Sequence, residues 1–260
     1  MTHVTRRLTA WALLLAVAVP ALAQRPLDYW DYTAAMRAAE RLDHLCAVAS
    51  LEDPSGPVLA VGDRFGLVRL LRLVDGQTRQ LWVSKQLRGQ VMEVLAADLD
   101  GDDRDELVAW TDSGNIYLWS AHEQRLLWES LTNDYNQITA VALGQVDDDE
   151  PLEIVVNADN RIHYVDGQSY TRQWTSPYEY TATRLRVGDV DGDGESELVL
   201  STGQVVGARN GDVEWDSEVF GTRLELLDID ADGIPEILAE NDGALMRIYD
   251  ADVQREKQLQ

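Results

Sequence analysis

The tripeptide Trp-x-Ser occurs four times at nearly constant spacing, and this repetition limits the possible folds more than any other feature of the chain. Successive copies lie 46, 46 and 41 residues apart, at Trp82-Val83-Ser84, Trp128-Glu129-Ser130, Trp174-Thr175-Ser176 and Trp215-Asp216-Ser217. A period of about 40 to 50 residues is typical of architectures in which one supersecondary unit is repeated. The chain is therefore expected to consist of similar units packed side by side.

An acidic motif recurs in the same register as the Trp-x-Ser motif. Its copies cover residues 98–107, 145–154, 189–198 and 228–237. A short apolar segment precedes each copy, a second follows it, and a turn then leads to a third segment and, after the first three copies, to the Trp-x-Ser segment. Segments of this length, separated by turn residues and without a 3.6-residue period, indicate β-strands. Four strands per unit predict the blades of a β-propeller.

We therefore predict an all-β fold, a single β-propeller of five blades with four antiparallel strands each, over residues 43–260. The first unit has the strand pattern but lacks the acidic loop, since Pro54, Ser55 and Pro57 stand in its place. The fifth unit has no Trp-x-Ser segment and reads as one strand short. We expect the N-terminal arm, residues 24–42, to supply the missing strand at 27–32 and so to close the ring, because closure removes exposed sheet edges. The alternative is that this arm is a disordered leader, although its Ala-rich part, 33–42, favours a short helix.

The first 23 residues have the features of a secretory signal peptide. A basic start is followed by an apolar stretch too short to span a bilayer comfortably and by the small-x-small sequence Ala21-Leu22-Ala23. A membrane anchor is the less favoured alternative, because Pro20 ends the apolar stretch. We expect a secreted or periplasmic protein whose mature chain has no transmembrane segment.

Charge and cysteine content exclude several classes of function. The chain has 46 acidic and 22 basic residues, a formal charge of −24, which argues against a nucleic-acid partner because phosphate contacts need clustered cations. The single cysteine cannot form an intramolecular disulfide or a thiolate metal site alone. The histidines share no spacing that would indicate a zinc site or a catalytic triad.

The acidic loops are the one constellation with evident chemistry. Carboxylates at loop positions 1, 3, 5 and 9, with a backbone carbonyl at position 7, can surround one cation, and Ca²⁺ accepts six to eight such oxygens in tolerant geometry. Mg²⁺ is a poorer candidate because it requires stricter octahedral geometry. Three loops are complete, and their candidate ligands are Asp98, Asp100, Asp102, Arg104 (carbonyl) and Glu106; Asp189, Asp191, Asp193, Glu195 (carbonyl) and Glu197; and Asp228, Asp230, Asp232, Ile234 (carbonyl) and Glu236.

The remaining copy departs from this pattern. Gln145 replaces the first acid, while Asp147, Asp149 and Glu153 remain. A single acidic turn would best be read as a solvated turn. Three complete copies in register favour metal binding instead, so we expect about three Ca²⁺ sites and a weaker fourth.

These loops resemble the FG-GAP/VCBS repeats of integrin-alpha-like β-propellers, in which the sequence D-x-D-G-D-G-x-x-[DE]-[LI] binds Ca²⁺. The resemblance covers about residues 43–250 and implies the ligands named above. Phe220-Gly221 precedes the fifth loop, but no Gly-Ala-Pro follows, so integrin-type adhesion is not implied. The segment GNIYLWSAHEQRLLWES also looks like a blade of the quinoprotein-like propellers, which supports blades and not a quinone cofactor.

Three hypotheses about function remain open from the sequence. The first is a calcium-binding, non-catalytic module that binds a protein or glycan, or acts as a scaffold, at the cell envelope. The alternative is a polysaccharide-active enzyme with its site at the mouth of the propeller channel; a fragment of a larger assembly is a third possibility. We expect the four Trp-x-Ser tryptophans to serve packing, and Trp110 and Trp119 to be the better candidates for an exposed aromatic site.

Overall fold

The computed structural model describes residues 45–51, 56–74, 76–241 and 245–257, and every regular element in these ranges is a β-strand. The strands are β1 (Leu45–Leu51), β2 (Val58–Asp63), β3 (Val68–Val74), β4 (Gln77–Val83), β5 (Val91–Ala97), β6 (Glu106–Thr111), β7 (Ile116–Ser120), β8 (Arg125–Glu129), β9 (Ile138–Gly144), β10 (Glu153–Ala158), β11 (Arg161–Asp166), β12 (Arg172–Thr175), β13 (Leu185–Gly188), β14 (Glu197–Leu200), β15 (Gln204–Gly207), β16 (Val213–Asp216), β17 (Arg223–Leu227), β18 (Glu236–Asn241), β19 (Leu245–Asp250) and β20 (Arg255–Lys257). The predicted signal peptide, residues 1–23, and the predicted N-terminal arm, 24–42, lie outside the described residues.

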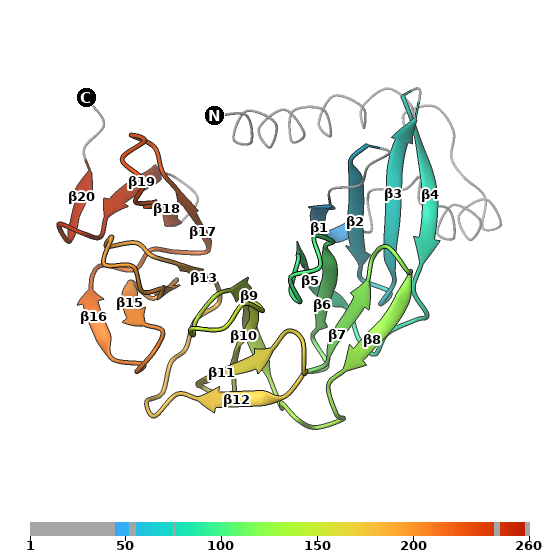
Figure 1. Cartoon of the computed structure of the whole chain (residues 1–260), viewed down its shortest axis with the longest axis horizontal. Coiled ribbons are helices and arrows are strands. Elements are labelled where there is room, and N and C mark those ends of the chain that lie inside the picture. The colour runs from blue at the N-terminus through green and yellow to red at the C-terminus, as the bar shows by residue number, and fades with distance from the viewer. Residues whose placement is uncertain (1–44, 52–55, 75, 242–244, 258–260) are drawn as a thin grey trace.

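The strands form five antiparallel sheets, each made of four strands that are consecutive in the chain: β1–β4, β5–β8, β9–β12, β13–β16 and β17–β20. The first strand of each sheet contacts the first strand of the next, so that β1, β5, β9, β13 and β17 lie at the centre. Figure 1 shows the sheets following one another in chain order around an arc, with the fourth strands at the periphery. The prediction of an all-β propeller with five four-stranded blades is confirmed.

Buried apolar side chains fill the spaces between consecutive sheets in four separate clusters. β6 illustrates why its inner positions, residues 107–110, are all apolar rather than alternating. Leu107 and Ala109 pack toward the first sheet, whereas Val108 and Trp110 pack toward the third, and all four are almost fully buried. Since successive side chains of a strand point to opposite faces, a strand covered on both faces carries a run of consecutive apolar residues.

The Trp-x-Ser motif serves packing and strand registration, as predicted for its tryptophans. Each of these tryptophans packs, partly buried, against the cluster on one face of its sheet, and the four are Trp82, Trp128, Trp174 and Trp215. In the second sheet the backbone N–H of Ser130 donates to the carbonyl of Ile116 at 2.9 Å, while the Ser130 hydroxyl accepts the N–H of Ile116 at 3.0 Å. The motif thus ends the outer strand with a fixed pairing to its neighbour.

The prediction for Trp110 and Trp119 is wrong. Both side chains are only 3% exposed, and each belongs to a cluster between two sheets. Trp119 lies edge-on to Trp82, with ring centroids 5.9 Å apart. Their proximity in sequence reflects two strands that are each covered on both faces, and they form no exposed aromatic site.

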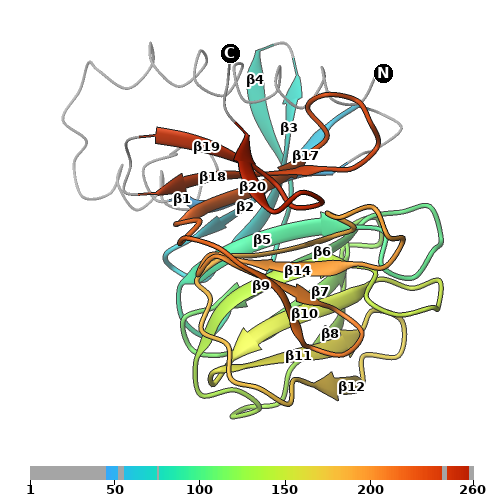
Figure 2. The ribbon, with the colours of Figure 1, turned by 90° about the vertical axis from the view of Figure 1, so that its left-hand side faces the viewer.

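The expectation that the last sheet is one strand short is also wrong. β17–β20 is complete within its own sequence, because β20 pairs with β19 through Ile248 and Lys257, Tyr249 and Glu256, and Asp250 and Arg255. Strand pairing depends on backbone groups, so this short strand needs no tryptophan. Figure 2 shows this sheet, in red, at the front of the molecule. The predicted closing strand at 27–32 lies outside the described residues.

No helix within the described residues has the length and apolar character needed to cross a bilayer.

Candidate metal sites in the acidic loops

Each acidic loop connects the first and second strands of a sheet, so the sheets from the second to the fifth carry one loop each. We name them loop 2 (98–106), loop 3 (145–153), loop 4 (189–197) and loop 5 (228–236) after their sheets. The residue at position 9 of every loop is the first residue of the second strand. The loops are therefore held at both ends by paired strands.

The glutamate at position 9 fastens every loop in the same way. One of its carboxylate oxygens accepts the backbone N–H of the apolar residue at loop position 2, which is buried in loops 2, 3 and 4 and exposed in loop 5. The four bonds measure 3.1, 3.0, 2.8 and 2.8 Å for Glu106 with Leu99, Glu153 with Val146, Glu197 with Val190, and Glu236 with Ile229. This bond explains why position 9 has a longer side chain than the aspartates before it.

In loops 2, 4 and 5 the aspartate at position 1 accepts backbone N–H groups from later positions of its own loop, and the loop folds back around its carboxylate. In loop 4 the Asp189 carboxylate accepts the N–H groups of Gly192 and Gly194 at 2.7 and 3.0 Å. Both glycines have positive φ, 80° and 91°, so the loop adopts a backbone that favours glycine. Asp103 takes the position of Gly194 in loop 2 with φ 65°, which aspartate tolerates better than most residues.

The curled loops bring together the carboxylates of positions 1, 3 and 9. Within the described residues, oxygens of each group lie within 4.8 Å of one another, in Asp98, Asp100 and Glu106; Asp189, Asp191 and Glu197; and Asp228, Asp230 and Glu236. The expected ligands at position 5, Asp102, Asp193 and Asp232, are not part of these groups. Asp193 and Asp232 instead accept the backbone N–H two residues ahead, at Glu195 and Ile234. The three carboxylates that converge are the ones that a cation could bridge.

The converging carboxylates disfavour one another's charge. Burial, with a further contribution from neighbouring carboxylates, raises the pKa of Glu106 and Glu153 to about 7 and that of Glu197 to about 8. One oxygen of Asp100 is buried without a hydrogen-bond partner. Such an arrangement favours either protons or a cation, and the all-oxygen ligand set suits a hard divalent ion such as Ca²⁺.

Loop 3 has a different internal structure, because Gln145 is not an aspartate. Its side-chain oxygen accepts the N–H of Asp147 at 3.0 Å, and its amide nitrogen donates to the carbonyls of Asp149 and Pro151. The carboxylates that converge come from positions 3, 5 and 9, namely Asp147, Asp149 and Glu153. The acidic residues that loop 3 shares with the other loops thus still converge, but through positions 3, 5 and 9 instead of 1, 3 and 9.

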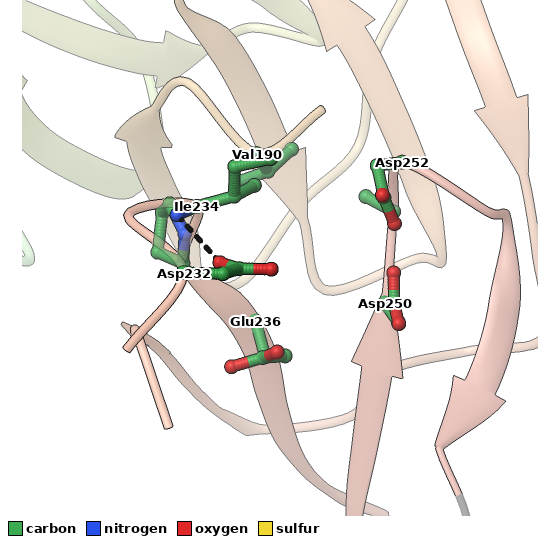
Figure 3. Close-up of a pocket in the computed structure, with 8 residues that line it drawn as sticks. Val190, Asp232, Ile234, Glu236, Asp250 and Asp252 are labelled. Carbon is green, nitrogen blue, oxygen red and sulfur yellow. Dashed lines mark hydrogen bonds between the residues drawn. The ribbon is translucent and has the colours of Figure 1, made fainter. Parts of the chain in front are cut away.

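Loop 5 contains a cation that belongs to the chain itself. The ammonium of Lys257, on β20, lies 2.6 Å from Oδ2 of Asp230, forms a second short contact with Oε1 of Glu236, and lies 3.7 Å from Asp250. Figure 3 shows Asp232, Glu236, Asp250 and Asp252 around the adjoining pocket. The sequence gives no sign of this contact, since Lys257 is 21 residues from Glu236 and outside every motif.

Neighbouring loops touch one another. The N–H of Leu152 in loop 3 donates to the carbonyl of Leu99 in loop 2 at 3.0 Å. Arg209 bridges Asp148 of loop 3 and Glu195 of loop 4, at 2.6 and 3.3 Å. Loops 2, 3 and 4 therefore form a connected series.

A second group of charged side chains lies on the central strands and was not singled out by the sequence. Arg186 on β13 forms a two-pronged ion pair with Glu225 on β17, at 2.8 and 3.1 Å. Glu93 on β5 lies 4.0 Å from Arg184 and accepts the indole N–H of Trp110 at 3.4 Å. These residues share no motif, so only the fold brings them together.

Comparison with known protein families found no match, and comparison with curated proteins found none either. Among solved structures, the chain is similar to BBS1N, whose crystal structure is a complex with ARL6DN, with a TM-score of 0.60 and 13% identity over 83% of this chain and 67% of that one. It is also similar to Sqt1 of Saccharomyces cerevisiae, with a TM-score of 0.57 and 14% identity over 76% of this chain and 57% of that one. At this level of identity the likeness shows the β-propeller fold alone.

Proposed function

We propose that this chain is an exported, calcium-binding β-propeller that acts as a non-catalytic binding or scaffold module for a protein or glycan at the cell envelope. The observation that carries the calcium proposal is the convergence of three carboxylates within 4.8 Å in loops 2 and 4, with no basic side chain among the ion-pair partners of these residues in the described part of the chain. Repulsion among these carboxylates opposes folding, and a divalent ion would turn it into attraction.

Thermal unfolding of the purified chain in calcium, in magnesium and in chelator tests this proposal. A site occupied at about 100 times its dissociation constant stabilises the fold by about 2.7 kcal/mol, so calcium should raise the melting temperature clearly and magnesium should do so less. Asp191→Ala in loop 4 should remove part of this rise. Asp216→Ala, which removes an exposed carboxylate from β16, is the matched control and should keep it. Equal melting of the wild-type chain in all three conditions would contradict calcium binding.

The binding role is supported by apolar side chains that the propeller leaves exposed. The connections after three successive Trp-x-Ser motifs expose Leu131, Tyr178 and Val219 to 73, 54 and 52%. A protein is the first partner class to test, since the similar chain BBS1N was solved with a protein partner. Replacing these three residues together by serine should weaken binding of a partner found in envelope extracts or glycan arrays, while Asp216→Ala should not.

The alternative, a polysaccharide-active enzyme, has one observation in its favour, the charged group at the central strands. A glycosidase needs two carboxylates free to act on one bond. Glu225 is held by Arg186, and Glu93 is engaged by Trp110. If the wild-type chain releases reducing ends from polysaccharides and the Glu93→Gln and Glu225→Gln variants do not, the enzyme is favoured. If the wild-type chain releases none, the scaffold role is supported.

A further inference from the structure

In loop 3, the copy that lacks the first acid, the residue paired directly opposite the position-9 glutamate is an aspartate, whereas in the complete loops 2 and 4 it is not. Asp166, the last residue of β11, is paired directly with Glu153, the first residue of β10. Side chains of directly opposed residues in an antiparallel pair lie on the same face of the sheet. The equivalent partners are Ser120 opposite Glu106 in the second sheet and Gly207 opposite Glu197 in the fourth.

The carboxylate of Glu153 is buried with one oxygen unpartnered. Its side chain is fully buried; Oε2 accepts the N–H of Val146, whereas Oε1 has no hydrogen-bond partner. An oxygen of the same carboxylate lies within 4.8 Å of oxygens of Asp147 and Asp149. A buried carboxylate keeps its charge in a folded protein when it is paired or bound to a metal, so the ionised form of Glu153 favours a cation at this position.

Asp166, which is paired opposite Glu153, adds to the negative charge around that residue. It is 5% exposed, and its negative charge acts on both Asp149 and Glu153. Of the ion pairs formed within the described ranges, none involves Asp147, Asp149, Glu153 or Asp166; Arg209 pairs with Asp148, whose side chain points away into solvent and is 83% exposed. The three converging carboxylates of loop 3 therefore have the acidic Asp166 beside them on the paired strand and no ion-pair partner within the described ranges.

The fifth sheet shows how a basic side chain of the protein compensates the same extra charge. There the residue opposite the position-9 glutamate is again an aspartate, Asp250, since the pairing of Ile237 with Tyr249 places it beside Glu236. The ammonium of Lys257 lies among Asp230, Glu236 and Asp250. Loop 3 has the acidic arrangement of loop 5 without the lysine.

We propose that loop 3 and β11 together form a divalent-cation site, in which Asp147, Asp149 and Glu153 converge on the ion and Asp166, paired opposite Glu153, supplies the fourth negative charge. Asp166 restores the acidic group that Gln145 removes, and Gln145 closes the loop through its bonds to the Asp149 and Pro151 carbonyls. The proposal rests on the proposed function in one respect, the identity of the ion, which is Ca²⁺ as in loops 2 and 4. It reverses the sequence-based expectation that this loop is the weak one.

Calcium titration of the full chain by calorimetry, with Tb³⁺ luminescence as a second probe, tests the site. Asp166→Asn keeps the hydrogen-bond acceptor for the N–H of Ser169 and removes the charge. We expect it to bind one Ca²⁺ fewer than the wild type, or to bind that ion at least tenfold more weakly. Asp148→Asn, in the same loop but exposed, is the matched control and should bind as the wild type does.

Two further measurements separate the possible failures. Asp166→Asn should melt higher than the wild type in chelator, because it removes one uncompensated charge; a lower melting temperature there, with unchanged calcium binding, would overturn the site and assign Asp166 to the fold. Asp191→Ala should lose a different ion and leave the Asp166-dependent one in place. Calcium binding by the wild type that is identical in Asp166→Asn defeats this inference alone, whereas no calcium binding by the wild type defeats the proposed function and this site with it.

Discussion

The ammonium of Lys257 lies 2.6 Å from the carboxylate of Asp230, at the third position of loop 5, where a bound ion would otherwise meet that carboxylate. It pairs with the buried Glu236 at the same time. A strand at the end of the chain thus supplies the positive charge for a loop that, by its sequence, is a complete calcium motif. The pKa of Lys257 is raised by its hydrogen bonds to these two carboxylates, and that of Asp230 is lowered.

The first prediction concerns Lys257. In Lys257→Met the carboxylates of loop 5 lose their partner, so the melting temperature in chelator should fall by several degrees. Calcium should then restore stability and bind with one additional equivalent, because the ion no longer competes with the ammonium. Calorimetric titration and melting curves measure both effects. Lys257→Arg keeps the charge and serves as the control; if it behaves like Lys257→Met, the pairing does not explain the stability of loop 5.

A second prediction concerns pH. Burial raises the folded-state pKa of Glu106, Glu153 and Glu197 from 4.5 to about 7, 7 and 8. Between these limits the folded chain binds more protons than the unfolded chain, so in chelator the free energy of unfolding should decrease as pH rises from 4.5 to about 8. Saturating calcium keeps the carboxylates ionised and should weaken or reverse this trend. A metal-free chain that becomes steadily more stable over this window would refute the assignment.

A third prediction concerns the clusters between sheets. Ile154 is completely buried between the second and third sheets, so Ile154→Ala should lower the free energy of unfolding by about 2–5 kcal/mol. Leu126→Ala, at a side chain 44% exposed on β8, should change it by less than about 0.5 kcal/mol. Urea denaturation of both variants provides the comparison.

A fourth prediction concerns the serine of the repeated motif. Ser130→Ala leaves the buried N–H of Ile116 without its acceptor, which should cost about 1–3 kcal/mol. In the fourth sheet the corresponding N–H, that of Gly203, donates to the carbonyl of Leu200 instead. Ser217→Ala should therefore be milder. Equal losses in the two variants would mean that the hydroxyl bond is not what the motif provides.

The fold could be read from the sequence because its strands are repeated in one register. Trp82, Trp128, Trp174 and Trp215 mark equivalent places, and every sheet that they predict is present. The strand Arg255–Lys257 was missed, because a short peripheral strand can pair through its backbone without any characteristic side chain. Trp110 and Trp119 were misjudged, since a sequence does not tell which aromatic residues of a blade have sheets on both sides.

The sequence predicted which loops carry converging carboxylates, but not which side chains from other strands approach them. The spacing of Asp189, Asp191 and Glu197 suffices to predict their convergence, because all three belong to one continuous turn. Position 5 does not join them, since Asp193 bonds to the backbone of its own loop. Asp166 and Lys257 approach the loops from other strands, and only the sheet pairing reveals them.

Among the described residues, each apolar cluster is shared by just two consecutive sheets, and this has a consequence for how that part of the molecule comes apart. In such a quasi-linear array the loss of one terminal unit removes one interface and leaves the others intact. Unfolding should therefore advance stepwise inward from an end of the arc. Ions bound in loops 2, 3 and 4 would slow the unfolding of the inner sheets. Proteases would therefore cleave the outermost sheets first.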